Sequence, residues 1–165
     1  VYKYPEQDNH KRYVCESCGY IHYKNPKMIT GVLPFHEDKV LLCLRDQEPG
    51  YGKWTLPAGF MEVEESVEEG AIREAYEEAN LNLELGELYT IYNIKHISQV
   101  YFLFLAKLKD LNFKPGMETL ETKLFSLSEI PWDEIAFAAV RFTLKQYCND
   151  FESKLFKFRM GTYSK

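Results

Sequence analysis

The chain has 165 residues, of which 45% are hydrophobic and 27% charged, and its formal net charge is −5. This length suits one domain with a small appendage, and the acidic balance disfavours a nucleic-acid partner, which would require a basic surface. The apolar runs, such as 100–106, are too short to span a bilayer, and the sequence contains no secretory signal. We therefore expect a cytoplasmic protein that contacts neither membrane nor nucleic acid.

Residues 1–27 are polar and irregular, and we expect them to form an N-terminal appendage that resembles a zinc ribbon, followed by the main domain over 28–165. Cys15 and Cys18 form a CxxC pair followed by glycine, which is typical of a zinc knuckle. A zinc site needs four ligands. Either His10 and His22 complete it, or a first cysteine pair precedes Val1 and is missing from this chain. We expect this ribbon to be a purely structural clip rather than a nucleic-acid-binding element.

In the rest of the chain, apolar residues recur with the spacing typical of either a strand or a helix. Strand patterns cover six segments: 27–35, 39–45, 54–60, 85–94, 98–108 and 122–127. Helical patterns cover 65–79 and 132–151, the second preceded by Pro131. Strands dominate, with one helix in mid-chain and one near the end. This order of elements predicts an α/β fold in which a mixed β-sheet lies between helices.

The first helical segment is unusually acidic. Eight glutamates lie between Glu62 and Glu78, and only Arg73 offsets them. Residues three and four apart share a helix face, so Glu74 and Glu77, with Glu78 beside them, gather at the edge of a buried stripe. That stripe consists of Ala71, Ala75 and Ala79, which should pack on the sheet.

A solvated acidic face is the commoner explanation for such a helix. However, solvated faces usually interleave lysine at i+4, because like charges repel, and no lysine lies between Lys53 and Lys95. A divalent cation would relieve this repulsion, since Mg²⁺ and Mn²⁺ prefer carboxylate oxygens and often share them with substrate phosphates. The segment therefore predicts metal-dependent phosphoryl chemistry.

Residues 59–81 resemble the Nudix box, G-x5-E-x7-R-E-U-x-E-E-x-G-U, in which U is aliphatic. The matching residues are Gly59, Glu65, Arg73, Glu74, Glu77, Glu78 and Leu81. Ala75 is small for the aliphatic position. Asn80 replaces the glycine that ends the helix, and asparagine also tolerates that left-handed conformation.

The resemblance implies a Nudix fold and hydrolysis of a nucleoside diphosphate linked to another group. Glu74, Glu77 and Glu78 correspond to the Mg²⁺ or Mn²⁺ ligands of the box. The main-chain carbonyl of Ala58 corresponds to a further ligand. Glu65 corresponds to the accessory carboxylate and Arg73 to its orienting partner.

Many Nudix enzymes also use a glutamate from a later loop as base or ligand. Glu118 and Glu121 are the candidates here, and we favour Glu118 because Gly116, two residues before it, would let it swing toward the metal. The alternative is that either residue only caps the following strand.

Nearly the whole chain is similar to a bacterial zinc-ribbon Nudix subgroup and to plant plastid FAD pyrophosphatases. This likeness implies an adenine dinucleotide as substrate, with FAD first and ADP-ribose or NADH as alternatives. Tyr51 and Trp54, in a loop beside the box, and His96, between two strands, are the candidate substrate contacts. By analogy we expect a homodimer. Two other classes remain open, namely a non-catalytic nucleotide sensor and a zinc-ribbon nucleic-acid adaptor.

Overall fold

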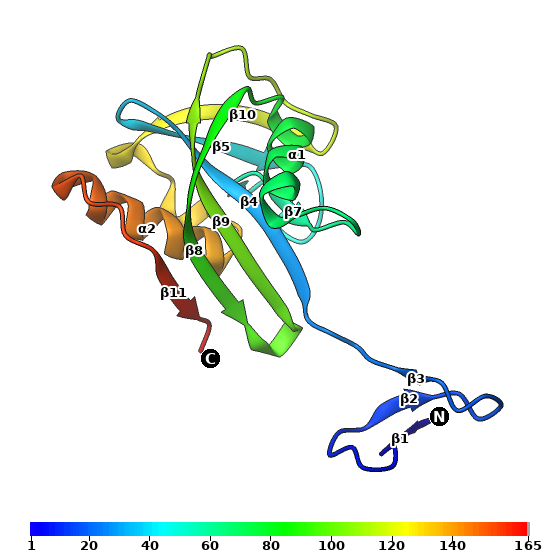
Figure 1. The fold of residues 1–165 in the computed structure, drawn as a ribbon. Helices are drawn as coiled ribbons and strands as arrows, with labels where there is room; N and C mark the ends of the chain where they lie inside the picture. Colours follow the sequence, from blue (N-terminus) through cyan, green and yellow to red (C-terminus); the bar gives the residue numbers. More distant parts are fainter. Residues whose placement is uncertain (165) are drawn as a thin grey trace.

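A mixed sheet forms the centre of the computed structural model, which describes residues 1–164 (Figure 1). Its strand order is β10-β5-β4-β9-β8-β11, with β6 paired to β5 and β7 to β4. The strands are β4 (Lys27–His36), β5 (Lys39–Arg45), β6 (Trp54–Thr55), β7 (Ala58–Phe60), β8 (Leu83–Ile94), β9 (Gln99–Leu108), β10 (Thr119–Ser126) and β11 (Arg159–Thr162). The β4–β9 and β8–β11 pairs are parallel and the others antiparallel.

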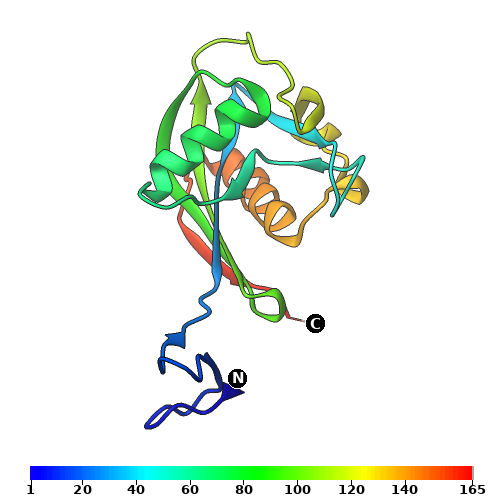
Figure 2. The ribbon, with the colours of Figure 1, turned by 90° about the vertical axis from the view of Figure 1, so that its right-hand side faces the viewer.

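Two helices cover the opposite faces of this sheet, α1 (Val67–Ala79) and α2 (Ala138–Ser153) (Figures 1 and 2). The alternation of side chains along each strand separates the core under α1 from the core under α2, and a third, smaller cluster of buried residues includes Ile29, Tyr92, Tyr101 and Ala139. On β5, for example, Leu41 packs in the α1 core and Leu42 in the α2 core. The predicted α/β fold, with a mixed sheet between helices, is confirmed.

The acidic helix α1 begins and ends with well-formed caps. The Ser66 hydroxyl accepts from the Glu69 amide, and the Glu69 carboxylate accepts from the Ser66 amide, which together form a capping box. Asn80 adopts the left-handed conformation at the C-terminal end, as predicted. Ala71, Ala75 and Ala79 are fully buried against the sheet, so the predicted alanine stripe is confirmed.

The second helix is shorter than predicted, because residues 132–137 take other conformations. Trp132–Glu134 form a 3₁₀ turn. Ile135 then bridges to Trp54, and the Ala136 amide donates to the Trp54 carbonyl. These contacts hold the chain extended against β6, so α2 begins only at Ala138. No helix within residues 1–164 is long and apolar enough to cross a membrane.

The two ends of the chain contain strands that the sequence did not reveal. Near the N-terminus, β1 (Tyr2–Lys3), β2 (Arg12–Val14) and β3 (Ile21–His22) form a small antiparallel sheet. This sheet stands away from the main body at the end of an extended segment (Figures 1 and 2). Near the C-terminus, β11 pairs with β8 at the edge of the main sheet.

Buried Asp150, on α2, fastens the C-terminal segment to the body. It accepts two hydrogen bonds from Arg159, both 2.6 Å long, one from the Tyr89 hydroxyl and one from the Lys157 amide. Arg159 is the largest cause that lowers the pKa of Asp150, which falls to about 2. An ionised carboxylate thus joins α2, β8 and β11.

Candidate active site

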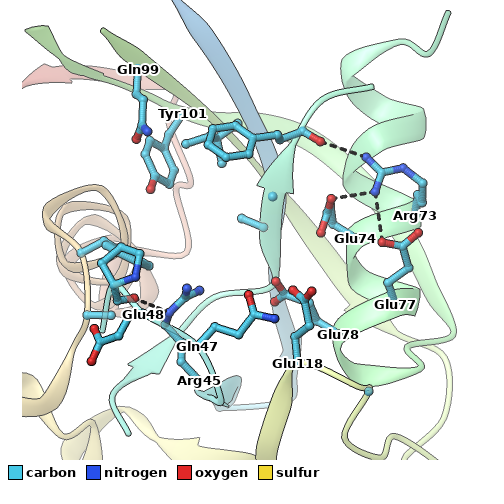
Figure 3. Close-up of a pocket in the computed structure, with 18 of the residues that line it drawn as sticks. Arg45, Gln47, Glu48, Arg73, Glu74, Glu77, Glu78, Gln99, Tyr101 and Glu118 are labelled. Carbon is cyan, nitrogen blue, oxygen red and sulfur yellow. Dashed lines mark hydrogen bonds and ion pairs between the residues drawn. The ribbon is translucent and has the colours of Figure 1, made fainter. Parts of the chain in front are cut away.

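A cavity of about 1050 Å³ opens beside α1 (Figure 3). One wall comes from α1 and β7 and carries Arg73 and three glutamates. A second comes from the loop after β5. A third comes from the tip between β8 and β9, the start of α2 and Tyr163. The acidic side chains are concentrated on the α1 side, whereas Gln99 and Tyr101 lie across the pocket from Glu74 and Glu77 (Figure 3).

Arg73 organises the acidic wall through five hydrogen bonds. Its Nε and Nη2 donate to the two carboxylate oxygens of Glu65 at 2.9 and 2.7 Å. Its Nη1 donates to Glu74 at 2.6 Å and to Glu77 at 3.2 Å, and Nη2 also donates to the Phe60 carbonyl. Since all five N–H bonds of the guanidinium are directed to these acceptors, Arg73 serves to orient carboxylates.

The Arg73 contacts affect its partners differently. The hydrogen bonds from Arg73 are the main reason that the pKa of Glu65 falls to about 2, so Glu65 stays ionised. Glu74 is buried, and desolvation raises its pKa although Arg73 opposes the shift. Gly59 makes room for this carboxylate, because a Cβ at Gly59 would lie 2.4 Å from it.

Glu78 and Glu118 lie together in the pocket, away from Arg73 (Figure 3). Desolvation, reinforced by repulsion from Glu74 and Glu118, raises the pKa of Glu78 to about 8. The charge of Arg45 lowers the pKa of Glu78, but the pKa remains above its usual value. This wall therefore carries more negative charge than its own arginines neutralise.

A divalent cation fits this donor set. Glu74, Glu77, Glu78 and Glu118 offer hard oxygen atoms, which Mg²⁺ and Mn²⁺ prefer, and their mutual repulsion would be relieved by a cation. Within residues 1–164, however, no three acidic, histidine or cysteine side chains already converge on one point. Glu74 and Glu77 are turned to Arg73 instead. Ala58, the predicted carbonyl ligand, also lines the pocket.

The two candidate glutamates of the later loop, Glu118 and Glu121, lie in different places. Glu118 lines the pocket, whereas Glu121 is exposed on β10 and lies outside it. The prediction that Gly116 lets Glu118 swing toward the metal is wrong, because Gly116 is not a hinge. Its amide donates to the Glu78 carbonyl at 2.8 Å, and a Cβ there would lie 1.8 Å from the Glu77 carbonyl oxygen. The glycine lets the loop pack on the end of α1.

Arg45, which the sequence analysis missed, lines the same pocket. Its Nε donates to the Pro49 carbonyl at 2.8 Å, and its guanidinium lies over the Phe137 ring at 4.9 Å. No carboxylate within residues 1–164 forms an ion pair with it. Its terminal nitrogens are thus available to an anion in the pocket. Its place at the end of an apolar strand, before a turn-rich loop, was a usable signal.

Of the three predicted substrate contacts, only His96 lines the cavity. Trp54 is buried in the α2 core, with its ring against Phe125, and Tyr51 is exposed outside the pocket. Three residues on the same side as His96 were missed: Gln99, Tyr101 and Tyr163. Tyr101 had no local signal, since its strand pattern indicated a core residue, and Tyr163 belongs to a segment to which the sequence assigned no structure.

The cysteine pair lies in the turn between β2 and β3, in the small N-terminal sheet that stands away from the main sheet (Figure 1). Both thiols are exposed, and Cys15 Sγ is 3.0 Å from the Ser17 hydroxyl. That contact is the main reason that the pKa of Cys15 falls to about 6. Neither His10 nor His22 joins the pair in a cluster of three ligands within residues 1–164, so the intrachain histidine hypothesis is not supported.

Comparison with known proteins gives two family matches. Residues 26–145 match the NUDIX domain family, and residues 1–24 match the Nudix N-terminal zinc-ribbon family. A NUDIX hydrolase structure from Nitrosomonas europaea superposes with a TM-score of 0.97 at 50% identity, covering 100% of this chain and 94% of that one.

Two relatives are described as ADP-ribose pyrophosphatases. A structure from Streptococcus suis is 28% identical with a TM-score of 0.65, covering 84% of this chain and 100% of that one. A protein from Methanocaldococcus jannaschii is 29% identical over 115 residues, which cover 66% of this chain and 67% of the relative.

Proposed function

Because this chain belongs to the Nudix hydrolase family, we propose that it is a Mg²⁺- or Mn²⁺-dependent pyrophosphatase that cleaves an adenine dinucleotide, with FAD as the leading substrate. The single observation that carries the proposal is the cavity itself. Carboxylates of the Nudix box crowd one wall, while Gln99, Tyr101 and Tyr163 lie on the side away from them. A diphosphate joined to planar rings matches this distribution.

In this proposal the acidic wall holds the metal. Glu74, Glu77, Glu78 and the Ala58 carbonyl are the proposed ligands, and a bound ion would polarise the diphosphate and lower the pKa of water. Zinc, if bound, would be held by the Cys15 and Cys18 pair.

The remaining residues bind and orient. Arg73 and Glu65 fix the carboxylates through the hydrogen bonds described above. Arg45 is free to contact a phosphate oxygen. Glu118 is the proposed acceptor for a proton of the attacking water. Water adds to one phosphorus and the P–O–P bond breaks, which yields AMP and FMN from FAD.

ADP-ribose is the second candidate substrate, and the two relatives described as ADP-ribose pyrophosphatases support it. A panel of FAD, ADP-ribose and NADH, with Mg²⁺ or Mn²⁺ and product identification by chromatography, separates the candidates. We expect FAD to give the highest kcat/KM. Intact FAD beside cleaved ADP-ribose would overturn that choice.

A non-catalytic nucleotide sensor is the alternative from another class. The same panel run with Glu78→Gln tests it, because turnover by the wild type that Glu78→Gln abolishes cannot come from a sensor. Binding without turnover in the wild type would favour the sensor. We also expect a cytoplasmic homodimer, for which light scattering coupled to size exclusion measures the oligomeric state.

A further inference from the structure

The wall across from the glutamates contains a hydroxyl without a partner. Tyr101, on β9, is only 6% exposed and lines the cavity. Its hydroxyl forms no hydrogen bond with any of residues 1–164. Within residues 1–164, every side-chain oxygen or nitrogen atom that is fully buried has a hydrogen-bond partner. The unpartnered Tyr101 hydroxyl is therefore not fully buried and is open to the cavity. Figure 3 shows it directed into the pocket.

Gln99 adds a second free polar group at the same place. It lies two residues before Tyr101 on β9, so both side chains are on the same face of the sheet. Its amide also makes no hydrogen bond within residues 1–164, and it can both donate and accept. The two side chains are adjacent in Figure 3. Burial raises the pKa of Tyr101, so at neutral pH this hydroxyl remains a donor.

Two aromatic rings adjoin these polar groups. His96, in the 3₁₀ turn Lys95–Ile97, and Tyr163, after β11, both line the cavity. Their ring centroids are 5.2 Å apart and the ring planes are inclined at 45°. The pair provides flat surface next to hydrogen-bonding groups, which is the combination that recognises a planar base.

The fold holds Tyr163 in place by several independent contacts. Its amide donates to the Asn93 carbonyl at 2.8 Å, and the Asn93 side chain donates to the Gly161 carbonyl at 3.1 Å. Gly161 allows β11 to lie close to Tyr92, since a Cβ there would be 2.8 Å from that ring. The ion pair between Asp150 and Arg159 anchors the strand from the other side.

A strand that only covered the edge of β8 would explain the pairing but not the free polar groups beside it. We infer that Tyr101, Gln99, His96 and Tyr163 form a subsite for a planar heteroaromatic ring of the substrate. Tyr163 and His96 contact the face of the ring, and Tyr101 and Gln99 hydrogen-bond to its edge. The inference rests on the proposed function, because it takes a dinucleotide as the ligand.

Two variants test the subsite without requiring turnover. Tyr101→Phe removes one oxygen and keeps the shape, and Tyr163→Ala removes the ring. Calorimetry with AMP and with FMN, without metal, should show that each variant weakens binding of one mononucleotide by about tenfold. Tyr163→Phe should bind as the wild type does. Tyr51→Phe and Tyr51→Ala are matched controls, because Tyr51 is exposed outside the cavity, and both should be unchanged.

Kinetics then identify the ring. If the subsite takes adenine, Tyr101→Phe raises KM for both FAD and ADP-ribose and weakens AMP binding. If it takes the isoalloxazine, only FAD and FMN are affected. In either case KM should change more than kcat, because the contacts lie away from the acidic wall.

The subsite is overturned if both variants bind AMP and FMN as the wild type does, or if the wild type binds neither. Failure of the proposed function gives a different result, namely a wild-type protein that cleaves no dinucleotide with Mg²⁺ or Mn²⁺. Binding of a mononucleotide that depends on Tyr101 would support the subsite even then.

Discussion

Arg73 donates two parallel hydrogen bonds to Glu65, whose carboxylate also accepts from the Glu62 amide at 2.7 Å. The same guanidinium reaches Glu74 and Glu77 on its own helix. One side chain therefore joins the loop before α1 to the acidic face of α1. A planar fork of five donors can do this, whereas the single ammonium group of lysine cannot.

Arg73→Lys should accordingly lower both stability and activity. The ammonium cannot keep the paired bonds to Glu65 and still reach Glu74. We expect the free energy of unfolding, measured with urea, to fall by about 1.5–3 kcal/mol. We expect kcat to fall by at least about tenfold. Arg141→Lys is the control, since Arg141 makes one long hydrogen bond of 3.5 Å. Equal effects in the two variants would contradict the orienting role.

The two later glutamates give a paired experiment. Glu118 lines the pocket and Glu121 does not, although they are three residues apart on the same segment. Glu118→Gln should reduce kcat by about 100-fold, which is the lower end of the usual range of about 10²–10⁴ for a proton acceptor. Glu121→Gln should leave kcat within about twofold of wild type. A reversed order would exclude Glu118 as the assisting carboxylate.

Features that depend on residues close together in the sequence could be predicted, whereas contacts between residues far apart in the sequence could not. The alanine period and the caps at Ser66 and Asn80 define α1 within the sequence itself, so its position and its acidic face could be predicted. Trp54 was misplaced because its burial depends on Ile135 and Phe125, which are far along the chain. The same holds for Tyr163, which follows a strand that pairs with β8 some seventy residues earlier.

Metal affinity should depend on pH through Glu78. Its pKa in the metal-free protein is raised to about 8, so at pH 7 an incoming cation must displace a proton. Mn²⁺ affinity should rise by up to about tenfold per pH unit between pH 6 and 8 and then level off. Calorimetry in buffers of different ionisation enthalpy measures the released proton. Glu78→Gln should remove this proton release and weaken Mn²⁺ binding.

The raised pKa of Glu78 also affects the stability of the metal-free protein. Stability should fall as pH rises, whereas Mn²⁺ affinity should increase. The folded state holds a proton on Glu78 that the unfolded state, with an ordinary pKa of 4.5, has released. The contribution of Glu78 is therefore fully present below pH 4.5 and is lost as pH rises through about 8. Urea unfolding without metal should show this loss in the wild type and not in Glu78→Gln. A wild-type protein and a Glu78→Gln variant with the same pH dependence would contradict the buried-carboxylate assignment.

Asp150→Asn should loosen the C-terminal strand. The change leaves Arg159 facing a neutral amide and weakens the acceptor for the Tyr89 hydroxyl, which donates at 2.6 Å. Removing one partner of a buried pair costs about 3–5 kcal/mol, and the partial exposure of Arg159 places the expected loss near the lower limit. Since Tyr163 follows this strand, KM for the dinucleotide should rise more than kcat falls.

The pH dependence of this loss provides a separate check. The pKa of Asp150 is lowered to about 2 from 3.8. Its stabilising contribution is thus present above pH 3.8 and lost as pH falls through about 2. The difference in unfolding free energy between wild type and Asp150→Asn should therefore be constant near neutral pH and shrink in strong acid. Asp133→Asn, at an exposed position, is the matched control and should change stability by less than about 0.5 kcal/mol at any pH. An unchanged KM in a destabilised Asp150→Asn would show that the ion pair supports the fold without positioning Tyr163.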